Sequence, residues 1–131
     1  MKKWMILAAC VLLVAITGGV TFKIKIDQMM KYFAEYPLKN ADLQTIADGT
    51  YHGSFGKFVV AVDLEATILQ HRIADIKIVK QKCGKGYEAK KILDRVLQAQ
   101  SLKVDAIAGA TGSSRCILIA IDRALTSPQA K

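Results

Sequence analysis

One short segment, residues 105–114, holds most of the side chains that could do chemistry. It reads DAIAGATGSS, with one carboxylate, two glycines and three hydroxyls. The glycines, Gly109 and Gly112, let a backbone approach a bound group closely. An amphipathic helix is predicted directly after the segment, and the first turn of a helix offers free N–H groups and a positive dipole end. These features predict a site for a phosphate or another anion, with Arg115 as a cation beside it.

A structural interpretation of the same segment stays open. In this alternative, Thr111 or Ser113 only caps the helix, and the two glycines only form the turn. The spacing differs from the G-x-x-x-x-G-K order of a Walker loop and from the G-x-G-x-x-G order of a dinucleotide-binding fold. The residues alone therefore leave two hypotheses, an anion site and a simple helix cap.

Other reactive side chains are too scattered for a metal or catalytic site. The three cysteines, at positions 10, 83 and 116, lack the paired spacing of a zinc site. His52 and His71 lie 19 residues apart, and neither has an acid or a nucleophile beside it in the sequence. We therefore predict no metal and no catalytic residue, and the ligand count disfavours a zinc hydrolase.

The elements that position this segment begin with a membrane anchor, predicted over residues 1–23. The chain has 131 residues, of which 52% are hydrophobic, and a net charge of +8; this length allows one small domain and a tail, not a barrel enzyme. Residues 4–22 contain no charge, and about 20 apolar residues span a hydrocarbon core. Cleavage as a signal peptide and lipidation at Cys10 are the alternatives. The flanking lysines do not decide the orientation.

Behind the anchor we predict a juxtamembrane linker over residues 24–44 and a folded domain over residues 45–127. The linker continues the anchor helix and stops before Pro37, because the residue before a proline disfavours helix. Gly56 and the stretch around Ala66 are the expected connections between strands. Period-two alternation predicts three strands, over Thr50–Phe55, Phe58–Glu65 and Ile68–Lys80.

The second half of the domain is predicted to be helical. Apolar residues recur with helical spacing from Ala89 to Leu97 and from Ile117 to Leu125. Val104–Ile107 is a candidate short strand between the two helices. The predicted fold class is α+β, a small antiparallel sheet with two packed helices, preceded by one N-terminal transmembrane helix.

Two stretches carry a resemblance that covers residues 45–126. The first is Asp48-Gly49-Thr50-Tyr51-His52-Gly53, and the second runs from Gln100-Ser101-Leu102 through Val104–Thr111 to the hydroxyl pair Ser113-Ser114. They are similar to the D-G-x-Y-x-G and V-D-A-V-S-G-A-T patterns of the FMN-binding domain family. That family includes flavin subunits of sodium-pumping NADH:quinone reductases and of Rnf-type complexes, and small membrane-anchored proteins.

The resemblance implies a protein that is anchored in the cell membrane by a single transmembrane helix. By the same resemblance, its extracytoplasmic domain binds FMN and carries electrons. In several members, a flavin transferase that uses FAD esterifies the threonine at the Thr111 position to the flavin phosphate. Ala108 departs from the pattern, which has serine or threonine there, so covalent and non-covalent FMN both stay open. The implied FMN-binding residues are Asp105, Gly109, Ala110, Thr111, Gly112, Ser113 and Ser114.

The implied partners are the membrane, redox donor and acceptor proteins or a quinone, and a flavin transferase. Nucleic acid is not expected, since no recognised module is present. The flavin ring needs an apolar or aromatic wall, for which Tyr51, Phe55 and Tyr87 are candidates; ordinary packing is their alternative. An electron-transfer domain is favoured over a stand-alone enzyme, because no acid–base pair is evident.

A second function follows from a basic patch. In this alternative function, the flavin site has decayed, and the domain is a non-redox, membrane-proximal module that docks on anionic lipid or a partner protein. The alternative for the patch itself is a solvated face that keeps the domain soluble. The six lysines are Lys77, Lys80, Lys82, Lys85, Lys90 and Lys91.

Overall fold

The computed structural model describes residues 1–82 and 89–127, and the chain divides into two compact units, Met1–Tyr32 and Phe33–Lys131. The first unit consists of helix α1, Lys2–Glu35, whose last residues belong to the second unit. Within the described residues, α1 is the one helix that is long and apolar enough to cross a membrane. This finding fits the predicted single-pass anchor.

Helix α1 satisfies two of its polar side chains internally and ends near a proline. The Thr17 and Thr21 hydroxyls donate to carbonyls one turn earlier, at 2.8 and 2.9 Å, so polar side chains in the apolar stretch keep hydrogen bonds. The helix ends at Glu35, two residues before Pro37, which confirms the expected helical continuation and its stop. The first half of the predicted linker is therefore part of α1.

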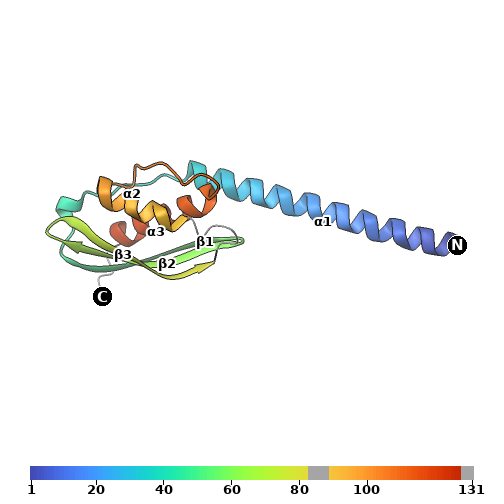
Figure 1. Cartoon of the computed structure of the whole chain (residues 1–131), viewed down its shortest axis with the longest axis horizontal. Coiled ribbons are helices and arrows are strands. Elements are labelled where there is room, and N and C mark those ends of the chain that lie inside the picture. Colours follow the sequence, from blue (N-terminus) through green and yellow to red (C-terminus); the bar gives the residue numbers. More distant parts are fainter. Residues whose placement is uncertain (83–88, 128–131) are drawn as a thin grey trace. The chain divides into compact units, whose positions relative to one another are not determined.

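The second unit contains a three-stranded antiparallel sheet in the order β1-β2-β3. Figure 1 shows α2 and α3 on the same face of this sheet. The arrangement confirms the α+β class. The elements are η1 (Leu43–Thr45), β1 (Gly49–Lys57), β2 (Val60–Leu69), β3 (Arg72–Lys82), α2 (Lys91–Ala99) and α3 (Thr111–Thr126).

Helix α3 supplies the core of the second unit. Twelve of its residues are buried, and it packs on β1 and β2. β2 is buried at every second residue from Val60 to Ile68, as expected for a sheet with one covered face. Where β1 crosses α3, Gly53 has no room for a side chain, because a Cβ there would clash with the Ala120 carbonyl and lie 2.7 Å from the Ala124 Cβ.

The first strand connection differs from the prediction at Gly56. β1 continues through Gly56, and the chain turns at Phe58 and Val59. Phe58 takes a left-handed conformation, with φ of +59°. Because Phe58 fits the apolar alternation, the sequence pattern starts the second strand at Phe58, two residues before β2 begins at Val60.

The second strand connection differs at Ala66. Ala66 lies inside β2 and is fully buried, while the turn is formed by Gln70 and His71, with φ of +52° and +61°. Two successive positive φ angles make a tight hairpin turn, which glycine and asparagine usually occupy. Asp48 stabilises this one, since its Oδ1 accepts the Gln70 N–H at 2.8 Å.

The predicted short strand Val104–Ile107 is wrong. The described part of the chain contains no ladder partner for this segment, and its carbonyls are bound by a side chain of α2 instead. Apolar residues in alternation become a strand only when a neighbouring strand pairs with them. The predicted loop Gly84–Gly86, Tyr87 and Pro128 lie outside the described residues.

Candidate functional site

The candidate site is the connection between α2 and α3, and its beginning is tied to the sheet. Gln100, the left-handed C-cap of α2, accepts the Ile73 N–H at 2.7 Å and donates to the Ile73 carbonyl at 3.0 Å. The Asn40 Oδ1 then accepts the Leu102 N–H at 2.9 Å and the Ser101 hydroxyl at 3.3 Å. The chain therefore enters the site from a fixed point.

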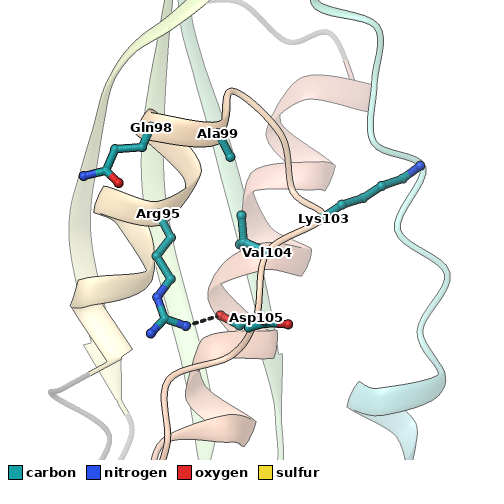
Figure 2. Close-up of a pocket in the computed structure, with 6 residues that line it drawn as sticks. All are labelled: Arg95, Gln98, Ala99, Lys103, Val104 and Asp105. Atoms are coloured by element: carbon teal, nitrogen blue, oxygen red, sulfur yellow. Dashed lines mark hydrogen bonds between the residues drawn. The ribbon is translucent and has the colours of Figure 1, made fainter.

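Arg95 of α2 holds the next part of the connection. Its Nη1 donates to the carbonyls of Asp105 at 2.8 Å and Ala106 at 3.3 Å. Figure 2 shows Arg95 reaching from α2 to Asp105, while Lys103 points away from Arg95. An open cavity of about 540 Å³ lies here, lined by Arg95, Gln98, Ala99, Lys103, Val104 and Asp105.

The tip of the connection folds back on the start of α3. Gly109 has φ of +78°, a conformation that glycine adopts without strain. The Ala110 N–H donates to the Ile107 carbonyl at 3.0 Å. The Ile107 N–H donates to the Ser114 Oγ at 3.1 Å, and Ser114 is fully buried. Ser114 thus closes the loop onto the first turn of the helix.

The start of α3 presents free donors and an exposed hydroxyl. Ser114 makes the first intrahelical bond, from its N–H to the Ala110 carbonyl at 2.9 Å, so the N–H groups of Thr111, Gly112 and Ser113 precede the hydrogen-bonded part of the helix. Ala110 is the N-cap and has no capping side chain, which excludes the simple cap by Thr111 or Ser113. Thr111 is exposed, whereas Gly112 and Ser113 are buried. A phosphate at the Thr111 hydroxyl would meet the positive end of the helix dipole.

Comparison with protein families agrees with this geometry. Residues 53–126, more than half of the chain, match the FMN-binding domain family.

This chain belongs to the FMN-binding domain family.

Its cofactor is accordingly FMN. A search of curated proteins and a search of solved structures each found no match.

The residues at the loop tip fit the phosphate end of FMN. The Thr111 hydroxyl makes no hydrogen bond to another described residue, and Thr111 is exposed. A Cβ built on Gly109 would meet no atom within 4 Å, so the space above the tip is open to a ligand. Bound FMN would supply redox chemistry, and the protein would hold and orient it.

Arg115 does not provide the expected cation for the candidate site. Its Nε donates to the Phe33 carbonyl at 2.9 Å, and its Nη2 donates to the carbonyls of Ala34 and Tyr36 at 3.3 and 3.2 Å. The last carbonyls of a helix have no partner within it, and Arg115 supplies one at the end of α1. The prediction is wrong because sequence adjacency to the loop said nothing of the side chain's direction.

The two described aromatic candidates for the flavin wall serve packing instead. Tyr51 is buried, and its hydroxyl donates to the Ala47 carbonyl at 2.7 Å. Phe55 is buried and packs edge-on against Phe33, with ring centroids 5.6 Å apart, while the Arg123 guanidinium lies 4.7 Å from its ring centre. Tyr87 lies outside the described residues.

Strand register places two lysines of the basic patch opposite acidic residues. Lys77 stands opposite Glu65, and Lys80 stands opposite Asp63, on the neighbouring strand β2. Opposite charges at facing positions stabilise a sheet and reduce its net charge. Lys85 lies outside the described residues. Two of the five described lysines of the patch thus face acidic residues, while Lys82 faces Ala61 and the exposed Lys90 and Lys91 lie outside the sheet.

Sequence reasoning missed Arg95, Asn40 and Asp122. Asp122 is only 2% exposed, and its Oδ1 accepts the Asn40 N–H at 2.9 Å. One signal was present for Asp122, an acidic residue with helical spacing to apolar neighbours on both sides. Arg95 gave no signal, because its partners are backbone carbonyls. No group of three or more metal-ligating side chains is found in the portion of the chain that the structure describes.

Proposed function

We propose that this protein is a membrane-anchored, extracytoplasmic electron carrier whose FMN is esterified through its phosphate to Thr111. The observation that carries the proposal is the exposed Thr111 hydroxyl at the N-terminus of α3, inside a segment that matches the FMN-binding domain family. The helix α1 supports the anchor. The apolar N-terminus and the family resemblance support an extracytoplasmic domain.

The attachment step balances with FAD as the co-reactant and a flavin transferase as the enzyme. The Thr111 Oγ forms a bond to the FMN-side phosphorus of FAD, and the phosphoanhydride bond of FAD breaks. AMP leaves with the electron pair of that bond, and the hydroxyl proton passes to a base or to water. No oxidation or reduction occurs in this step.

The chain's own groups would then hold the phosphate. The ester would keep one negative charge, and the N–H groups of Gly112 and Ser113 in the first turn of α3 would hold it. A negative charge at a helix N-terminus is stabilised by about 0.3–1 kcal/mol. Redox chemistry belongs to FMN, and electrons pass between a membrane donor and a quinone or protein acceptor.

Intact-mass spectrometry tests the attachment. The full chain is purified from its native host, and a denaturing gel is viewed under ultraviolet light. We expect the mass to rise by one esterified FMN that survives denaturation and maps to Thr111. Thr111→Val, which has nearly the same shape without the hydroxyl, should lose this mass completely, and Thr111→Ser should keep it.

The other outcomes are informative. Yellow protein that loses its colour on denaturation would show reversible FMN and point to Ala108 as the reason. Colourless protein that binds no added FMN would contradict the proposal and favour the docking module. Covalent FMN that persists in Thr111→Val would place the attachment at another residue.

A further inference from the structure

Arg95 makes a contact with the site that no part of the proposed function uses. It stands in the middle of α2, and its side chain is exposed. Its Nη1 nevertheless donates to two successive carbonyls, those of Asp105 at 2.8 Å and Ala106 at 3.3 Å. The contact joins a helix to an irregular segment across ten residues of sequence.

The contact lies between two points at which the connection is bound to other parts of the fold. Before it, Leu102 is bound to Asn40. After it, Ile107 is bound to Ser114. Between these two points, within the described residues, the carbonyls of Asp105 and Ala106 are bound by Arg95. Arg95 therefore holds the backbone that leads to Ile107, the residue that Ser114 joins to the first turn of α3.

We propose that Arg95 is a positioning residue for the flavin site, which fixes the backbone at Asp105 and Ala106 so that the Thr111 hydroxyl is presented to the flavin phosphate. The inference rests on the proposed function. Arg95 acts through the backbone of the connection and contacts the loop from outside. The expected effect is on flavin uptake more than on unfolding, because exposed contacts contribute little to global stability.

The chemistry of the side chain favours arginine over lysine at this position. A guanidinium is planar and rigid, and it reaches neighbouring acceptors in a fixed geometry, whereas an ammonium is a compact charge on a flexible stem. Arg95→Lys should retain the charge and lose part of the geometry. Arg95→Gln should lose both.

The test compares the full-length wild type with Arg95→Gln, Arg95→Lys and a control, Lys90→Gln. Lys90 is an exposed cation directly before α2, so the control removes the same charge away from the connection. Three quantities are measured in detergent: the rate of flavin attachment with FAD and a flavin transferase, the affinity for free FMN, and hydrogen exchange at the amides of Ile107 and Ala110. The thermal unfolding midpoint is recorded for each variant.

We expect Arg95→Gln to slow attachment, or to weaken FMN binding if the flavin is reversible, by about tenfold. Exchange at the two amides should rise, and the thermal midpoint should change little. Arg95→Lys should recover part of the loss, and Lys90→Gln should match the wild type.

Distinct results would overturn the two claims separately. If the wild type takes up no flavin, the proposed function fails. If the wild type takes up flavin and Arg95→Gln does so equally fast, the positioning role fails, even if exchange rises. Unchanged exchange in Arg95→Gln also contradicts the positioning role. If Arg95→Gln does not fold, unchanged uptake in a folded Arg95→Lys variant would overturn the geometric part of the claim.

Discussion

Two segments carry the family resemblance, and the structure gives them opposite physical roles. The opening segment, Asp48–Gly53, is built into the fold. Asp48 holds the β2–β3 turn, Tyr51 is buried, and Gly53 lies against α3 without room for a Cβ. The second segment, Asp105–Ser114, holds its backbone through Arg95 and Ser114 and leaves Thr111 exposed.

The difference shows that a family pattern contains both packing constraints and chemical ones. A glycine against a helix restricts the residue type through packing, and an aspartate under a turn restricts it through a hydrogen bond. Exposure separates the two kinds of residue. The contrast makes a sharp prediction: changes in the opening segment should alter stability, and changes in the second should alter flavin uptake.

The largest effect is expected for Gly53→Ala. The new Cβ would clash with the Ala120 carbonyl, and the backbones of β1 and α3 would have to separate. Overpacking of this kind costs up to about 3 kcal/mol, which lowers the thermal midpoint of a small domain by about 15 °C. Thermal unfolding of the full chain in detergent measures it.

Gly109→Ala is the matched control for this change. Its Cβ would meet no atom within 4 Å, and only the positive φ of +78° opposes it, at about 1–2 kcal/mol. Equal midpoints for the two alanine variants would break the distinction between a packed glycine and a turn glycine.

Ser114→Ala should affect both stability and flavin uptake. It removes the acceptor of the Ile107 N–H in a fully buried place, and an unsatisfied buried donor costs about 1–3 kcal/mol. Ser113 is also buried, and its side chain makes no hydrogen bond within the described residues, so Ser113→Ala should cost less. Chemical denaturation and FMN uptake are measured on both variants. A larger loss for Ser113→Ala would contradict the role of Ser114 in closing the loop.

Asp48→Ala should lower stability and leave flavin uptake unchanged. The variant loses the acceptor of the Gln70 N–H at the β2–β3 turn, which is worth about 0.5–1.5 kcal/mol. The measurement pairs the thermal midpoint with the fraction of protein that carries FMN. A fall in FMN at a temperature where the variant is folded would show that the opening segment reaches the site.

The smallest effect on stability is expected for Ala108→Ser. Ala108 is exposed at the loop tip, and such surface changes stay within about 0.5 kcal/mol. The added hydroxyl restores the residue type of the family pattern, so flavin attachment should become faster. Initial rates with FAD and a flavin transferase decide this, and an unchanged rate would remove Ala108 as an explanation for reversible FMN.

The sequence predicted the elements whose patterns are local. Alternation marked the strands, helical spacing marked α2 and α3, and uncharged length marked α1. It failed where a distant residue decides the conformation. The turn at Gln70 and His71 is held by Asp48, 22 residues away, and Val104–Ile107 has no strand partner among the described residues. Residue spacing predicts neither the distant aspartate under the turn nor the missing strand partner.

The candidate site divides in the same way. The loop, the helix start and Thr111 followed from residue types, since glycines and hydroxyls before an amphipathic helix have a defined meaning. The directions of Arg95 and Arg115 did not follow, because both side chains bind backbone carbonyls. A carbonyl is present at every position, so the sequence gives no sign of which one an arginine selects.

The crossing of β1 and α3 also sets an order of events in time. The ribosome makes the three strands before α3, and Gly53 and Ala120 are separated by 67 positions in the chain. Until α3 is made, the faces of β1 and β2 on which it packs stay uncovered by it, and such long-range contacts form slowly. The first turn of α3, with Thr111, therefore takes its place only after the strands on which α3 packs have been made.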